Sequence, residues 1–96
     1  KAFAESYALG ALAYGKKEYG KALEHLSKIN IEYSARKQQI KNLMIVIYCE
    51  TGAYENALNL IDTSKHSLKH DKQIPEERKK TFSKFLVFAG KYIKLD

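Results

Sequence analysis

Residues 16–23 read KKEYGKAL, and residues 51–58 read TGAYENAL. In both stretches a Tyr stands three positions before an Ala-Leu pair, and an aliphatic residue follows the Ala four positions later, Leu26 in the first copy and Ile61 in the second. The two copies lie 35 residues apart. A repeat in the middle thirties is typical of helical-hairpin solenoids, in which a turn and a second helix recur in each unit. The sequence therefore predicts a fold of stacked helical hairpins.

The composition is that of a helical globular domain. The chain has 96 residues, of which 45% are hydrophobic and 29% are charged, with one Pro and five Gly. Such a balance disfavours a disordered chain, and the scarcity of turn residues disfavours an all-β fold. A chain of this length makes a single domain, residues 1–96. Because it begins at Lys1 and enters a helical pattern at once, we expect a fragment of a longer protein, with a cytoplasmic location as the default.

Apolar residues at helical spacing predict five helices joined by short connections. Gly52 is expected to supply a left-handed cap between two of them, and Pro75 to open the last, because Pro is favoured in the first helical turn. The helices form two hairpins, repeat one over 3–33 and repeat two over 35–72, followed by a C-terminal helix. The predicted helices are residues 2–15, 18–28, 35–50, 53–72 and 75–95.

The packing of these helices can also be anticipated. Gly10 falls inside the first helix, where Gly costs about 1 kcal/mol relative to Ala, so we expect it to allow close approach of the next helix. The polar second half of the fourth helix, 63–73, is expected to project beyond its hairpin. The fifth helix should cap the hydrophobic end or self-associate. We expect Phe88, Tyr92 or Leu95 to remain partly exposed. The face that packs on the fourth helix is expected to consist of Phe82, Phe85, Leu86, Ala89 and Ile93.

The repeat resembles the tetratricopeptide family, over about residues 3 to 66. The first copy departs from the family pattern at Ser6 (Trp in the family), Ala13 (Tyr) and Lys17 (the turn Gly), and the second at Lys41 (Trp) and Met44-Ile45 (Leu-Gly). Neither copy ends in the family's Pro. The region from Ile61 onward, with residues 85–88, also resembles the C-terminal end of tetratricopeptide proteins of Bacteroidota-type bacteria. The matching residues, which we take as repeat-packing positions, are Leu9, Gly10, Tyr19, Ala22 and Leu26 in the first copy and Tyr48, Gly52, Tyr54, Ala57 and Ile61 in the second.

The resemblance implies an all-α, right-handed α-α superhelix that acts as a protein–protein interaction scaffold. In this family the first helix of each hairpin lines a concave groove that holds a peptide or partner domain. Some members grip a C-terminal carboxylate with a clamp of Lys, Asn and Arg. Only Asn42 is a candidate here, and Tyr7 and Ala11 stand where a Lys and an Asn would be needed, so we do not expect this clamp. Alternatively, Tyr7 and Tyr14 pack against a neighbouring repeat. The residues that the resemblance places on the concave face are Ala4, Tyr7, Ala11 and Tyr14 from the first copy and Gln39, Asn42, Val46 and Cys49 from the second.

A second hypothesis starts from the charge. The net charge is +6, and the densest basic cluster runs from Lys65 to Lys80. It suggests a basic adaptor surface for nucleic acid or anionic lipid, although no aromatic side chains interleave it, as single-strand binding would require. A solvated basic face is the default interpretation, and a structural segment of a larger repeat array is a third possibility. The cluster comprises Lys65, Lys69 and Lys72 in the fourth helix and Arg78, Lys79 and Lys80 in the fifth.

The sequence offers little chemistry for catalysis. Asp62, His66 and His70 share one helix face and could hold a transition metal, but a fourth ligand is lacking and residue 67 is Ser instead of the metalloprotease Glu. A solvated face is the simpler interpretation, so we expect no metal or other cofactor. Cys49 has no activating His beside it, and the sequence contains no nucleophile elbow or phosphate loop. We therefore expect that the chain is not an enzyme. The longest apolar run, 43–48, is too short to span a membrane.

Overall fold

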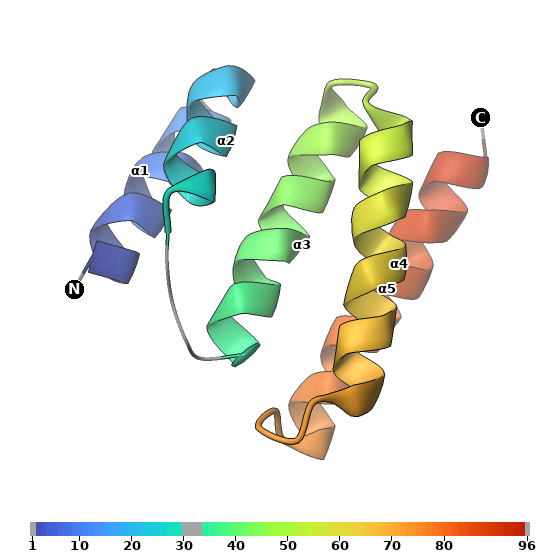
Figure 1. The fold of residues 1–96 in the computed structure, drawn as a ribbon. Helices are drawn as coiled ribbons and strands as arrows, with labels where there is room; N and C mark the ends of the chain where they lie inside the picture. Colours follow the sequence, from blue (N-terminus) through green and yellow to red (C-terminus); the bar gives the residue numbers. More distant parts are fainter. Residues whose placement is uncertain (1, 30–33, 96) are drawn as a thin grey trace. The chain divides into compact units, whose positions relative to one another are not determined.

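The computed structural model describes residues 2–29 and 34–95 (Figure 1). These residues form helices and turns and contain no strand, which confirms the predicted all-α class. The chain divides into two compact units, one with α1 and α2 and one with α3, α4 and α5. The prediction of a single domain over 1–96 stays a prediction. The helices are α1 (Ala2–Gly15), α2 (Tyr19–Ser27), α3 (Ser34–Glu50), α4 (Tyr54–His70) and α5 (Glu76–Lys94), each within two residues of its predicted bounds.

In the N-terminal unit, α1 packs against α2 through a glycine. A Cβ atom placed on Gly10 would lie 2.9 Å from Cδ2 and 3.0 Å from Cγ of Leu26, and 3.5 Å from the carbonyl oxygen of Ala22. Ala22 and Leu26 are buried, with exposed fractions of 0% and 1%. The expected close approach at Gly10 is therefore confirmed, and it explains why the α1 interior tolerates a residue that disfavours helix.

The turn between α3 and α4 follows a Schellman motif. Gly52 has φ of 78°, so the predicted left-handed cap is confirmed. The amide N–H of Ala53 donates to the carbonyl oxygen of Tyr48 at 2.8 Å, and that of Gly52 donates to the carbonyl oxygen of Cys49 at 3.3 Å. These two bonds satisfy carbonyl groups that the end of α3 would otherwise leave without a partner.

The turn between α1 and α2 has the same structure, with Lys17 in the place of the glycine. Lys17 has φ of 64°, in the left-handed region that side chains disfavour. The amide N–H of Glu18 donates to the carbonyl oxygen of Ala13 at 2.8 Å, and that of Lys17 donates to the carbonyl oxygen of Tyr14 at 2.9 Å. Donors and acceptors are thus those of the second turn, each displaced by 35 residues. The turns of the two hairpins therefore share one pattern of backbone hydrogen bonds.

In the C-terminal unit, α3, α4 and α5 all contact one another around one core. The expected division of α5 into a buried and an exposed side is confirmed, with Phe85 half-buried and Phe88, Tyr92 and Leu95 exposed. The core residues are Ile45 of α3, Ala57, Ile61 and Leu68 of α4, Ile74 of the connection, and Phe82, Leu86, Ala89 and Ile93 of α5.

The second half of α4 does not project beyond the hairpin, so that expectation was wrong. Leu68 is only 4% exposed and belongs to the same core as Phe82. The connection to α5 is short and folds back, because an Oδ1 atom of Asp71 accepts hydrogen bonds from the backbone amides of Gln73 (2.7 Å) and Ile74 (3.2 Å). This tight turn places α5 along α4. As a result, α5 covers Leu68, the apolar residue in the otherwise polar second half of α4.

Candidate functional site

The C-terminal unit carries a groove between α3 and α5, called the apolar groove below. It has a volume of about 210 Å³. Two helices form its walls, and each contributes side chains one helical turn apart, because residues three or four positions apart share a helix face. The groove is lined by Ile45, Val46, Cys49 and Glu50 of α3 and by Phe85, Phe88, Ala89 and Tyr92 of α5.

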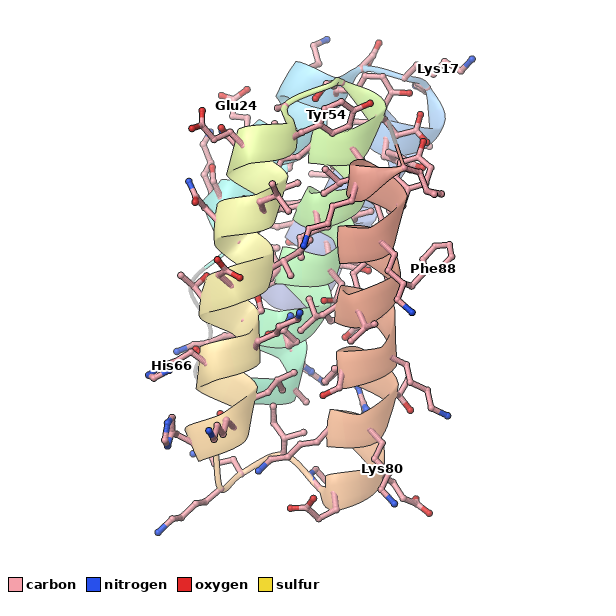
Figure 2. The ribbon with its side chains drawn as sticks, turned by 90° about the vertical axis from the view of Figure 1, so that its right-hand side faces the viewer. Lys17, Glu24, Tyr54, His66, Lys80 and Phe88 are labelled. Carbon is pink, nitrogen blue, oxygen red and sulfur yellow. The ribbon has the colours of Figure 1, made fainter. Side chains whose placement is uncertain are left out.

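Two aromatic side chains make the α5 wall of the groove unusual for a surface. Phe88 is 68% exposed and Tyr92 is 49% exposed. Figure 2 shows Phe88 extending outward from α5. Scattered exposed apolar residues are ordinary, whereas exposed aromatic rings grouped along a groove make it a candidate for a binding site. Val87, at 44% exposed, extends this apolar surface along the outer side of α5.

The thiol of Cys49 forms part of the α3 wall. Burial, and secondarily the negative charge of Glu50, raise the pKa of this thiol above its ordinary value. The thiol therefore stays protonated at neutral pH and behaves as a small apolar group. A thiol in this state serves packing or ligand contact and is a poor nucleophile.

The structure brings together only part of the predicted concave face. Val46 and Cys49 line the apolar groove. Gln39 is exposed and Asn42 is half-buried, and neither lines that groove. The side-chain oxygen Oδ1 of Asn42 accepts a hydrogen bond from Nε2 of Gln38 at 2.8 Å, so its amide is engaged along its own helix.

The predicted residues of the first copy lie in the N-terminal unit. Tyr7 and Tyr14 are half-buried, and Ala11 is exposed. The ring of Tyr14 lies 6.0 Å from the ring of Tyr19, centroid to centroid, at an interplanar angle of 58°. This tilted contact joins α1 to α2 within the hairpin. It gives Tyr14 a packing role within its own hairpin, and the alternative hypothesis that Tyr7 and Tyr14 pack against a neighbouring repeat stays a prediction.

Sequence reasoning missed the contribution of α5 to the groove. The sequence predicts that the fifth helix caps the hydrophobic end or self-associates, with Phe88, Tyr92 or Leu95 partly exposed, but it does not predict a groove shared with the third helix. A signal was present, since Phe88 and Tyr92 are four residues apart and lie off the stripe formed by Phe82, Leu86 and Ile93. What the sequence could not indicate was that α3 lies beside this second stripe.

The repeat-packing residues divide into buried and exposed groups. Leu9 is 49% exposed, because it precedes Gly10 by one residue and so lies about 100° around α1 from the face that meets α2. Gly52 is exposed at its turn. The three tyrosines Tyr19, Tyr48 and Tyr54 are half-buried, and Gly10, Ala22, Leu26, Ala57 and Ile61 are buried.

A second hollow, called the basic hollow below, lies between the end of α4 and the start of α5. Its volume is about 500 Å³. Of the predicted basic cluster, Lys72 and Arg78 do not line it; the guanidinium of Arg78 lies over the ring of Phe82, 5.2 Å from the centroid. The lining residues are Lys65, Leu68 and Lys69 of α4 and Glu76, Lys79, Lys80, Ser83 and Lys84 of α5.

The three residues considered as metal ligands, Asp62, His66 and His70, lie on the exposed side of α4. The rings of His66 and His70 are 4.7 Å apart, centroid to centroid, and Asp62 is exposed like both of them. Figure 2 shows His66 directed away from the other helices of its unit. Within residues 2–29 and 34–95, no three His, Cys, Asp or Glu side chains are grouped so that they could hold a metal ion.

Comparison of the chain with protein-family models, curated proteins and solved structures found no match. In the part of the chain that the structure describes, no helix is long and apolar enough to cross a bilayer.

Proposed function

We propose that the chain is a protein–protein interaction scaffold of the tetratricopeptide type, and that its apolar groove holds an amphipathic helix of a partner protein. The observation that carries this proposal is the groove between α3 and α5, with Phe88 68% exposed along its wall. Apolar and aromatic side chains that line a concave surface are typical of binding sites for other molecules.

Two features support a solenoid of repeated hairpins. The turns at Lys17 and Gly52 share their backbone hydrogen bonds at a displacement of 35 residues. Furthermore, α5 contacts both α3 and α4. In a solenoid each repeat packs against its neighbours, and the first helix of a following repeat would make such contacts. The right-handed superhelix and the family itself belong to this proposal.

The chemistry of the groove favours a helical occupant. Both walls are helices, and side chains form the lining, so the groove offers ridges and gaps of the kind into which a third helix packs. In the described residues there is no strand whose edge could pair with an extended peptide. Recognition through apolar anchors at helical spacing fits these walls.

The lysines on the α5 side of the groove favour an acidic flank on the part of that helix that faces them, whereas the α3 wall carries the carboxylate of Glu50. Lys84 and Lys91 border the outer surface of α5 together with Val87 and Phe88. The whole chain carries a net charge of +6, which adds a general attraction for an acidic partner. We therefore assign to the partner helix a stripe of apolar residues, with Glu or Asp on the side that faces the lysines of α5.

The test uses a labelled synthetic peptide of about 20 residues with Leu along one helical stripe and Glu beside it, and a twin with Lys in place of Glu. Fluorescence anisotropy measures the Kd of each peptide for the full chain. We expect the Glu peptide to bind more tightly than its twin. Phe88→Ala should weaken the Glu peptide about tenfold or more, because aromatic anchors dominate such interfaces. Phe88 is exposed, so this variant should keep the fold.

The matched control is Leu12→Ala, which removes an apolar side chain that is 56% exposed in the N-terminal unit. Its affinity for the Glu peptide should stay within about twofold of the wild type. Equal loss in both variants would show non-specific hydrophobic adsorption and overturn the proposal. A dimer of the free chain that Phe88→Ala converts to a monomer, measured by light scattering, would identify a second copy as the occupant and likewise overturn it.

A further inference from the structure

Five lysines from two helices surround the basic hollow. Lys65 and Lys69 come from α4, and Lys79, Lys80 and Lys84 come from α5. The buried side chain of Leu68 is also part of the lining. The tight turn after α4 brings these residues together, since it folds the start of α5 back along the end of α4. Figure 2 shows the outward position of Lys80 on the first half of α5.

The hollow has far more positive than negative charge. Its one carboxylate, Glu76, lies 3.8 Å from the ammonium nitrogen of Lys79, and the side chain of Lys79 is only 19% exposed. For the other lysines of the hollow, no carboxylate of the described residues lies within 4.0 Å of an ammonium nitrogen. Ammonium groups that surround one hollow repel one another, and an anion in the hollow would relieve that repulsion.

The shape and lining of the hollow identify the kind of anion. At about 500 Å³, it has the size of a small-molecule site and not of a track along a polymer. None of its lining residues is aromatic, so it lacks the stacking surface that single-stranded nucleic acid uses. An acidic peptide carries one charge per residue, whereas a phosphate group carries about −1.5 to −2 in a much smaller volume. Several phosphates on one compact molecule therefore match several lysines around one hollow.

We propose that the basic hollow binds a compact anion with several phosphate groups, held by Lys65 and Lys69 from one side and by Lys80 and Lys84 from the other. The ammonium groups act as point charges with rotatable donors, so recognition depends on charge density more than on a fixed arrangement of oxygens. A soluble oligophosphate and a multiply phosphorylated lipid headgroup present the same chemistry. The hollow shares no lining residue with the apolar groove, although Lys84 also belongs to the lysines proposed to face the partner helix. The phosphate proposal does not depend on the function proposed for the groove.

The test titrates the full chain with inorganic tripolyphosphate and follows backbone amide signals by NMR. We expect saturable shifts in the residues around the hollow. The double variant Lys65→Gln/Lys69→Gln should weaken binding about tenfold, because two exposed charge contacts of somewhat under 1 kcal/mol each are lost. The control Lys16→Gln/Lys21→Gln removes the same charge from exposed positions of the N-terminal unit and should change affinity less than about twofold.

A second arm distinguishes the sources of the phosphate. Sedimentation measures how much protein binds to two kinds of vesicle with the same total charge. One kind carries this charge on phosphatidylinositol bisphosphate, and the other carries it on phosphatidylserine. Stronger capture by the bisphosphate vesicles, lost in Lys65→Gln/Lys69→Gln, indicates a headgroup site. Tripolyphosphate binding without such capture indicates a soluble ligand, and either result supports the proposal. Equal weakening by both double variants, or tighter binding of a duplex oligonucleotide than of tripolyphosphate, would overturn it.

Discussion

An exchange of Lys17 and Gly52 tests whether the two hairpins are built on one turn. Both residues have positive φ, 64° at Lys17 and 78° at Gly52. Gly reaches this region at no steric cost, whereas a side chain costs about 1–2 kcal/mol there. No atom lies within 4 Å of a Cβ placed on Gly52, apart from its immediate neighbours, so strain of the backbone is the main effect of a substitution at that position.

We expect Lys17→Gly to raise the free energy of unfolding of the N-terminal hairpin by about 0.5–1 kcal/mol. The variant removes about 1–2 kcal/mol of left-handed strain from the folded state. Gly also increases the conformational entropy of the unfolded chain, which lowers stability by about 0.4–1 kcal/mol. Gly52→Lys reverses both contributions and should lower the stability of the C-terminal unit by a similar amount. The double exchange keeps composition and charge unchanged, so an altered net charge cannot explain its effects.

The assay combines urea unfolding, followed by circular dichroism, with amide hydrogen exchange to assign each change to one hairpin. The control is Lys16→Gly, the same chemical change one residue earlier, where φ is not positive. It should destabilise by up to about 1 kcal/mol, because only the entropy of the unfolded chain changes. If Lys17→Gly destabilises as Lys16→Gly does, then Lys17 is not left-handed in solution, and the equivalence of the two turns is refuted.

Two further substitutions probe the interior, each measured by urea unfolding. Gly10→Ala should lower the free energy of unfolding by about 1 kcal/mol, because the clash with buried Leu26 costs about 1–3 kcal/mol and the better helix propensity returns about 1 kcal/mol. Ser64→Ala should raise it by about 1 kcal/mol, because the hydroxyl of Ser64 is buried in α4 without a hydrogen-bond partner. The controls are Gly20→Ala, with open space around its Cβ, and Ser67→Ala on the exposed side of α4.

The controls decide how these results are interpreted. Gly20→Ala should be neutral or stabilising, and Ser67→Ala should stay within about 0.5 kcal/mol of the wild type. If Gly10→Ala stabilises as much as Gly20→Ala, the contact between α1 and Leu26 is looser than the structure indicates. If Ser64→Ala leaves stability unchanged or lowers it, the hydroxyl finds a partner in solution.

The helices and their turns could be predicted because they depend on residues close together in the chain. Apolar spacing located five helices within two residues of their bounds, and Gly52 indicated the left-handed cap that α3 adopts. Lys17 is instructive in this respect. Its residue type argues against a left-handed conformation, yet the position adopts it because two backbone hydrogen bonds of the Schellman motif close there.

The two candidate sites, by contrast, are decided by tertiary structure. Periodicity shows that α5 has a second apolar stripe with Phe88, but only the packing of α5 beside α3 turns it into the wall of a groove with Val46 and Cys49. Likewise, a row of lysines on α4 is a solvated face until the turn after Asp71 brings the lysines of α5 opposite to it. The sequence by itself determined the helices and turns, because helix caps and helix faces depend on residues only a few positions apart in the chain. Which faces meet depends on burial summed over three helices, so the structure alone decided where a ligand can bind.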